Sequence, residues 1–221
     1  MRSATFSLVV ACMCLHHPVV AQWVRDLNAF PAASFTPSSM GSELSFFDVD
    51  EDGWDDLTVC SQSEPTKYYR NNQGLFELTY SFPNTEGSKS CVWADLENDG
   101  DNDLIVAQFY QGIHVFRNEG NNVFSPAPSP LTDIPGTAGN HCGLSLGDVN
   151  RDGYLDVAVA NWTVTTSNSL YMNANGAAWY AANQPALASQ MKLSFQPAFV
   201  DIQRDLFPEL FFCNDHDLGN E

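Results

Sequence analysis

The sequence predicts an all-β fold, a β-propeller of four-stranded blades, and three observations lead to that prediction. An acidic motif occurs four times in the 221 residues, with first acids at Asp48, Asp95, Asp148 and Asp201 that are 47, 53 and 53 residues apart. A turn carrying Asn and Gly follows each of the first three motifs at a nearly constant distance. Short apolar runs rich in β-branched and aromatic residues surround both landmarks. A repeat of about 50 residues with about four strands has the size of a propeller blade.

The acidic motif is the most regular feature of the chain. Its four copies read "FDVDEDGWDDLTV", "ADLENDGDNDLIV", "GDVNRDGYLDVAV" and "VDIQRDLFPELFF". The nine residues that begin at each first Asp together hold 17 of the 27 Asp and Glu residues. Because like charges this close repel one another, the clustering needs a local cause, and bound cations are the first explanation to consider.

The turn that follows sets the phase of the repeat. It reads "YRNNQGLF", "FRNEGNNVF" and "YMNANGAAW", and its Asn71, Asn118 and Asn173 lie 23, 23 and 25 residues after the first Asp of their windows. Apolar runs stand before the acidic loop ("CVWA", "GLSLG"), after it ("LTV", "LIVA", "VAVA"), and on both sides of the turn ("KYYR", "IHVF", "SLYM", "LFELTY"). These runs predict four strands in each repeat.

The repeats are expected around residues 42–82, 89–127, 142–182 and 193–221, which makes about three and a half blades. The chain ends at Glu221, before the turn of the fourth repeat. A propeller closes by bringing its first and last blades together, so we expect residues 22–221 to be the N-terminal part of an incomplete propeller in a longer protein. The alanine-rich stretch "AANQPALASQM" could hold one turn of helix, which Pro185 disfavours.

The N-terminus predicts export. Arg2 and an apolar run of ten residues, Phe6 to Leu15, precede Val19 and Ala21, which suit the −3 and −1 positions of a cleavage site. We interpret residues 1–21 as a signal peptide of a secreted, extracellular protein, with cleavage after Ala21. The segment "VVAC" offers a less favoured alternative, lipoprotein processing at Cys12. No later segment is long and apolar enough to span a membrane.

The net charge limits the kinds of binding partner that we expect, and the number of cysteines limits the possible disulfide bonds. A formal charge of −18 with only nine Lys and Arg argues against a nucleic-acid partner, whose phosphates require a basic face. Four cysteines remain after removal of the signal peptide, and an exported chain could pair them in three ways that the sequence does not separate. Each also sits in or beside an apolar run, where Cys often acts as a small buried hydrophobe. The four are Cys60, Cys91, Cys142 and Cys213.

The spacing within the acidic loop suits Ca²⁺, which takes six to eight oxygen ligands. In the first loop these would be the carboxylates of Asp48, Asp50, Asp52 and Asp56 with the backbone carbonyl of Trp54. Gly53 would provide the sharp turn, and Glu51 and Asp55 would point to solvent. Mg²⁺ is less favoured because it holds its waters, and transition metals prefer His or Cys, which the loops lack.

A helix–loop–helix calcium site begins with a similar pattern but closes with Glu at position 12. Position 12 is Val59, Val106, Val159 or Phe212 here, and the residues after position 9 read as a strand. The same reasoning excludes dockerin modules, whose two loops continue into helices.

Together, the loops and turns resemble the FG-GAP, or VCBS, repeats of secreted bacterial proteins, which are related to the calcium-binding blades of the integrin α-subunit propeller. The resemblance covers residues 42–221. It implies a β-propeller in which each loop joins the first two strands of a blade and binds one Ca²⁺, so about three sites are expected. The implied ligands are Asp48, Asp50, Asp52 and Asp56 in the first loop, Asp95, Glu97, Asp99 and Asp103 in the second, and Asp148, Asn150, Asp152 and Asp156 in the third, with the backbone carbonyls of Trp54, Asp101 and Tyr154.

The fourth loop departs from the pattern. Gln203 is neutral, Leu206 replaces the turn glycine, Pro208 stiffens the loop, and Glu209 replaces the closing Asp. A Leu held at positive φ costs roughly 1 kcal/mol or more. We therefore expect Asp201, Asp205 and Glu209 to bind calcium weakly or not at all.

Two functions remain open at this point. The favoured one is a non-catalytic scaffold for adhesion or for recognition of an extracellular protein or polysaccharide, because the acids are committed to calcium and His114, His141 and His216 stand at non-equivalent positions of the repeats. The alternative is the propeller portion of an extracellular polysaccharide-degrading enzyme. Loops after the second strand carry Tyr110 and Trp162, which could stack on a sugar or simply pack between blades.

Overall fold

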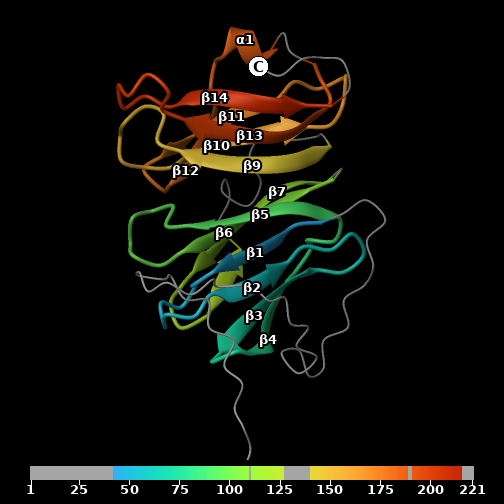
Figure 1. The fold of residues 1–221 in the computed structure, drawn as a ribbon, viewed down its shortest axis with the longest axis vertical. Helices are drawn as coiled ribbons and strands as arrows, with labels where there is room; N and C mark the ends of the chain where they lie inside the picture. Colours follow the sequence, from blue (N-terminus) through green and yellow to red (C-terminus); the bar gives the residue numbers. More distant parts are fainter. Residues whose placement is uncertain (1–41, 110, 127–139, 189–190, 216–221) are drawn as a thin grey trace, which may run out of the picture.

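The computed structural model describes residues 42–109, 111–126, 140–188 and 191–215, and these form an almost entirely β structure (Figure 1). The predicted signal peptide, Tyr110 and His216 lie outside the described residues. The described part of the chain contains three four-stranded sheets and one two-stranded sheet, all antiparallel and with their strands in chain order. The prediction of about three and a half propeller blades is confirmed.

We name the sheets blades 1 to 4. Blade 1 comprises β1 (Leu44–Phe47), β2 (Asp56–Val59), β3 (Thr66–Asn72) and β4 (Leu75–Phe82), and blade 2 comprises β5 (Ser88–Ala94), β6 (Asp103–Gln108), β7 (Gly112–Asn118) and β8 (Phe124–Pro126). Blade 3 comprises β9 (His141–Gly147), β10 (Asp156–Asn161), β11 (Ser169–Ala174) and β12 (Ala178–Ala181), and blade 4 comprises β13 (Ser194–Val200) and β14 (Glu209–Asn214).

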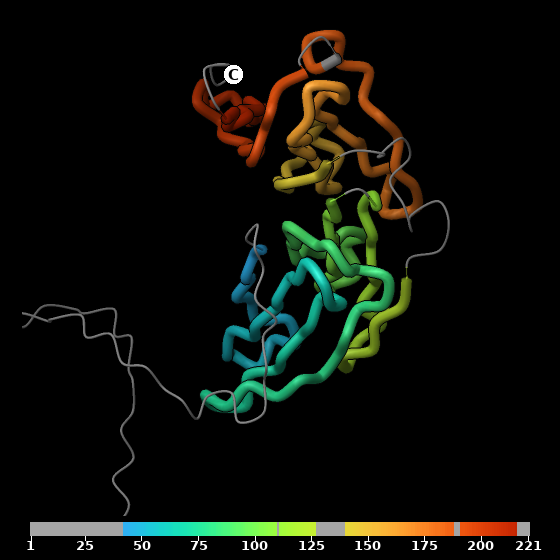
Figure 2. Tube along the Cα trace, turned by 90° about the vertical axis from the view of Figure 1, so that its right-hand side faces the viewer, coloured from blue at the N-terminus to red at the C-terminus, as the bar shows by residue number. Residues whose placement is uncertain are grey.

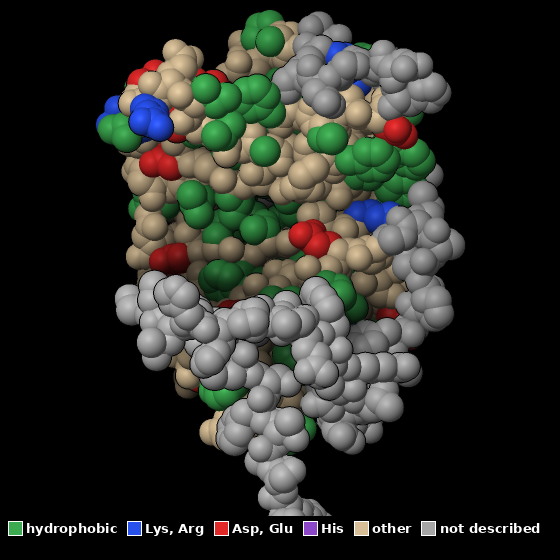
Figure 3. All heavy atoms as spheres, in the orientation of Figure 1, with side chains coloured by type: hydrophobic (Ala, Val, Ile, Leu, Met, Phe, Trp, Pro, Cys, Tyr) green, Lys and Arg blue, Asp and Glu red, His purple; other side chains and the backbone are tan. Residues whose placement is uncertain are grey.

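The blades follow one another along an arc. Figure 2 shows this arrangement from blade 1 (blue) to blade 4 (red), with the first strand of each blade towards the concave side. Isolated bridges between Phe109 and Asn140, and between Trp162 and Leu193, join neighbouring blades. In Figure 3 hydrophobic side chains gather around a hollow between the sheets on the face formed by these first strands.

The hydrophobic cores lie between blades, and the second strands explain why their sequences are continuously apolar. Every residue of β6 and β10 is buried. Successive side chains of a strand point to opposite faces, so Leu104 and Val106 pack towards blade 1 while Ile105 and Ala107 pack towards blade 3. The strand β10 alternates in the same way between the cores shared with blades 2 and 4. A strand buried on both faces cannot show the polar alternation of a surface strand.

One turn of helix, α1 (Pro185–Ala188), connects blades 3 and 4. The expectation that Pro185 disfavours it was wrong, because Pro185 is the first helical residue. There its missing N–H removes no hydrogen bond and its fixed φ suits the helix. No helix in the described ranges is long and apolar enough to cross a membrane.

Candidate metal centre

The acidic loop of each blade connects its first two strands, and the four loops lie on the same side of the array, at the left of Figure 1. The first Asp closes each loop by accepting two backbone N–H groups. In the first loop Asp48 accepts from Asp52 at 3.0 Å and from Gly53 at 2.9 Å. The corresponding distances in the second and third loops are 3.0–3.1 Å. This Asp therefore shapes the loop before any cation is considered.

Two positions of each loop have a left-handed backbone. The fourth position is Glu51, Asn98, Arg151 or Arg204, with φ between 57° and 62°. The sixth is a glycine with φ between 89° and 98° in the first three loops, and Leu206 with φ 71° in the fourth. Because the four loops share this conformation, the hairpin persists where the glycine is lost, at the expected cost in strain.

The ninth residue of the motif is buried and ties the loop to the third strand. Asp56 is 1% exposed. Its oxygens accept from the backbone N–H groups of Val49 at 3.2 Å and Asn71 at 2.8 Å, and from the Tyr68 hydroxyl at 2.7 Å. Asp103 and Asp156 accept the equivalent pairs of backbone N–H groups. This Asp is thus a structural acceptor, a role that the sequence analysis did not assign to it.

The Asn of the turn completes this connection. Asn71 donates its side-chain amide to the backbone carbonyl of Asp55 at 2.9 Å and accepts from the Gly74 N–H at 2.7 Å. Asn118 and Asn173 accept from Gly120 and Gly176 in the same manner. The ninth-position Asp and this Asn are 15 residues apart in the first two blades and 17 in the third. This nearly constant spacing is the sequence signal that could have revealed the contact between them.

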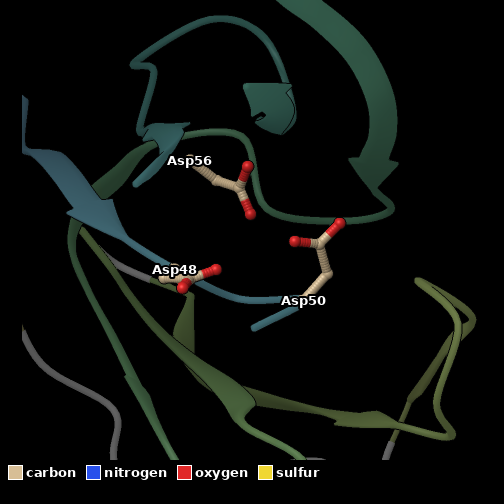
Figure 4. Close-up of side chains that lie close together, drawn as sticks. All are labelled: Asp48, Asp50 and Asp56. Atoms are coloured by element: carbon tan, nitrogen blue, oxygen red, sulfur yellow. The ribbon is translucent and has the colours of Figure 1, made fainter. Parts of the chain in front are cut away.

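In the first loop, three of the predicted ligands converge. Asp48, Asp50 and Asp56 each offer a carboxylate oxygen, and these oxygens all lie within 4.8 Å of one another (Figure 4). Asp50 Oδ1 is buried and has no hydrogen-bond partner among the described residues. Three converging carboxylates with a buried, unpartnered oxygen form a donor set of hard oxygens, which fits Ca²⁺. Among the described residues, this is the one group of three acids, His or Cys that meets this distance.

The electrostatics of the first two loops also favour an added cation. Burial raises the pKa of Asp56, and nearby Asp50 raises it further. Burial raises the pKa of Asp103 to about 6. The pKa of Glu97 rises to about 7, first through burial and then through repulsion from Asp103. A carboxylate whose pKa is raised by burial and like charge is one that a nearby cation would stabilise.

Arginines from the third strands partly balance this charge. Arg70 contacts Asp50 through Nε at 2.5 Å and Asp52 through a terminal nitrogen at 2.8 Å. Arg117, at the equivalent place in blade 2, lies 3.2 Å from Glu97. The third blade has Met172 there. Arg70 thus pairs with Asp50, which belongs to the converging group, and with Asp52, which does not.

The remaining predicted ligands form hydrogen bonds that maintain the shape of their loops, but in the described part of the chain their carboxylate oxygens do not meet in a group of three as those of Asp48, Asp50 and Asp56 do. Asp99 and Asp152 accept the backbone N–H of the residue two positions on, at 3.1 and 2.9 Å, as Asp52 does with Trp54 at 3.0 Å. Asn150 donates to Asp152 at 2.8 Å. Glu51 and Asp55, expected to point to solvent, are exposed.

The fourth loop has its own internal partner. Glu209 accepts from the backbone N–H of Ile202 at 2.8 Å and from the side-chain amide of Gln203 at 2.7 Å, and these hydrogen bonds lower its pKa. Asp201 accepts from Asp205 and Leu206 as in the other loops. The Gln203 amide therefore occupies an oxygen of Glu209, the carboxylate that would close a calcium site in this loop. Weak or absent calcium binding by the fourth loop stays a prediction.

A cleft of about 610 Å³ lies at the opposite ends of the strands, lined by residues that include Lys89, Phe109 and Trp162. The Trp162 ring packs against Phe109, with centroids 6.1 Å apart, and stacks on Phe195 at 5.9 Å. Trp162 therefore packs between blades. Its indole Nε1 is buried without a hydrogen-bond partner among the described residues.

Two solved structures share the fold. A lectin from Agrocybe aegerita, described as recognising non-reducing terminal N-acetylglucosamine, aligns with a TM-score of 0.50 and 19% identity over 76% of this chain and 45% of its own. A structure of BBS1N in complex with ARL6DN aligns with a TM-score of 0.50 and 13% identity over 77% of this chain and 50% of its own. At these identities the likeness concerns the fold alone.

Sequence comparisons point to the repeat itself. Integrin alpha-3 from Cricetulus griseus and from Mus musculus are each 36% identical over 76 residues, which cover 30% of this chain and 7% of the integrin. The chain thus spans a small part of these relatives. The profile of the FG-GAP-like repeat matches residues 48–106 and 95–159, which together make just over half of the chain and include the first three acidic loops. The chain belongs to the FG-GAP-like repeat family.

Proposed function

We propose that this chain is part of a secreted, non-catalytic β-propeller that binds calcium in its acidic loops and recognises an extracellular protein or polysaccharide. The observation that carries the proposal is the first loop, where Asp48, Asp50 and Asp56 converge and Asp50 Oδ1 is buried without a partner. Family membership supports it, because FG-GAP repeats of the integrin type often bind Ca²⁺ and propellers of this kind are generally recognition domains.

In this proposal calcium neutralises the loops and joins the ends of the first two strands of a blade. Asp48, Asp50, Asp52 and the Trp54 carbonyl would hold the ion, and Asp56 would link it to the third strand through Asn71. The second and third loops repeat this plan with the ligands that the family resemblance implies. About three ions per chain are expected, with the fourth loop weak or empty.

The proposed recognition surface is the cleft beside Lys89, Phe109 and Trp162, at the ends of the strands opposite the acidic loops. It combines aromatic rings with Gln62, Glu86 and Asn140, a mixture of apolar and polar groups that suits ligand binding. His141 is buried and His114 stacks on Phe116, which favours structural roles for both. These placements support the non-catalytic function over the enzymatic alternative.

Thermal melting of the calcium-free chain tests the calcium part of the proposal. Calcium at a hundredfold excess over its Kd adds about 2.7 kcal/mol to the free energy of unfolding for each site, or a rise in melting temperature of roughly 5–10 °C. Chelator should reverse the rise. Asp50→Asn should reduce it, whereas the matched substitution of the exposed Asp55→Asn should leave it unchanged. Indifference of the wild-type chain to both calcium and chelator would refute the proposal.

A glycan and protein binding screen, followed by product analysis on the glycans that bind, tests the recognition part. Binding without turnover by the calcium-loaded protein is expected, and Trp162→Ala should weaken it. Release of shortened glycans would favour the polysaccharide-degrading alternative instead.

A further inference from the structure

The seam between blades 1 and 2 contains two cysteines, Cys60 and Cys91. We propose that they form a disulfide bond that links the two blades covalently. Cys60 directly follows β2, and Cys91 lies in the middle of β5. The inference rests on the proposed export of the chain, because such bonds persist in oxidising compartments.

The backbone around both cysteines is held in place from both blades. The Cys60 N–H donates to the backbone carbonyl of Glu43 at 3.1 Å, and the Cys91 N–H donates to the Glu43 carboxylate at 2.9 Å. Further along the seam, the Ser61 N–H donates to the Ser88 hydroxyl at 2.9 Å. The two cysteines therefore meet in a fixed geometry and not through mobile loops.

The side chains meet in the core of the seam. Cys60 is 4% exposed and Cys91 is 3% exposed, and both belong to the cluster that includes Tyr68, Phe82 and Trp93. The two thiols are close enough for Cys60 to raise the pKa of Cys91. Both side chains thus belong to one buried cluster, and both backbone N–H groups donate to the same residue, Glu43, which places the two cysteines side by side in the seam.

The other two cysteines show no such relation. Cys142 is half-buried in β9 beside Lys89, and Cys213 is exposed in β14, where its strand partner is Gln196. Of the six single bonds that four cysteines allow, the seam therefore selects the one between Cys60 and Cys91.

The bond forms while the seam is still open. Two S–H bonds break, one S–S bond forms, and two protons and two electrons pass to an oxidising disulfide, such as glutathione disulfide or a thiol–disulfide oxidoreductase, which leaves as two thiols. The neighbouring Cys60 and burial raise the pKa of Cys91, so this thiol stays protonated and reacts slowly once the blades have packed. Oxidation is therefore expected during folding.

Peptide mapping tests the proposal. The full chain is exported, and a second sample is refolded from the reduced state with reduced and oxidised glutathione, with calcium and again with chelator. Both samples are denatured without reductant and alkylated. The expected product is a peptide containing Cys60 joined to one containing Cys91, lighter by two hydrogens than the two thiol peptides. The glutathione sample reports on the pairing whether or not the chain is exported or binds calcium.

Thermal melting gives an independent readout. Reduction before refolding should lower the melting temperature of the wild-type chain by roughly 5–15 °C. The difference between oxidised and reduced protein should vanish in the Cys60→Ala, Cys91→Ala double variant and persist in the matched Cys142→Ala, Cys213→Ala control. Alkylation of both Cys60 and Cys91 in the denatured, unreduced refolded sample, or a bond from either to another cysteine, would overturn the proposal.

Discussion

Replacing Arg70 by Met should tighten calcium binding in the first loop. Arg70 holds Asp50 and Asp52, two of the proposed ligands, through the ion pairs described above. Met is the residue that blade 3 carries at the equivalent place, Met172, so the substitution makes the first loop resemble the third. A guanidinium that already neutralises two ligands opposes the arrival of a divalent cation at the same oxygens.

The magnitude follows from the exposure and the charges. The Arg70 side chain is 44% exposed, so a dielectric constant near that of water applies to its interactions. A divalent ion about 5 Å from a unit positive charge is then opposed by about 1.7 kcal/mol, which corresponds to roughly a ten- to twentyfold change in Kd. In the calcium-free chain the lost ion pairs should cost about 0.5–1 kcal/mol, as is usual for exposed pairs.

Trp54 lies in the first loop and is 45% exposed, so its fluorescence reports on that loop during a calcium titration. The Arg70→Met chain should reach half-saturation at roughly a tenth to a twentieth of the wild-type calcium concentration. A Trp54→Phe chain identifies the signal, and the reverse substitution Met172→Arg should weaken the third loop. An unchanged or weaker affinity of the Arg70→Met chain would show that Arg70 positions the ligands for calcium and does not compete with it.

Two further predictions concern stability. The folded calcium-free chain binds more protons than the unfolded chain between about pH 4 and pH 7, because the pKa of Glu97 is raised to about 7 and that of Asp103 to about 6. Its melting temperature should therefore fall as the pH rises from 5 to 8, less steeply in Glu97→Gln, and a rise over this range would contradict the assignment. Leu206→Gly should raise the free energy of unfolding by about 1 kcal/mol in chemical denaturation, because Leu206 has φ 71°. Gly153→Ala should lower the free energy of unfolding. An added Cβ there meets no atom within 4 Å, so the strain of the left-handed backbone is the only effect of the substitution. Equal stability of both variants and the wild-type chain would refute the strain argument.

Much of the fold could be predicted from the sequence because each blade is a local structure. The apolar runs before and after each acidic loop became its first two strands, and "LIVA" and "VAVA" are continuous because both faces of β6 and β10 are buried. The acidic loop occurs once in each of the four blades and the turn once in each of the first three, so their regular spacing alone predicted the repeat. Even the fourth loop, which lacks the glycine, kept the hairpin through Leu206 at positive φ.

The roles that depend on contacts between strands or blades could not be predicted in this way. From its place in the motif, Asp56 is predicted to be a ligand only, whereas in the structure its hydrogen bonds also join the loop to Asn71 in the third strand. Contacts between blades leave no periodic signal: Asn98 donates to the carbonyl of Gly153 at 2.9 Å, and a Cβ at Gly176 would lie 2.7 Å from the Cα of Glu97. Such contacts arise from the packing of one sheet on the next.

Calcium binding by the acidic loops is the central claim, and isothermal titration of calcium into the chelator-treated chain tests it most directly. We predict about three ions per chain, and one fewer in Asp50→Asn, which removes a proposed ligand without touching the hydrogen bonds of Asp48 that close the loop. A folded chain that takes up no calcium at millimolar concentration would contradict the account.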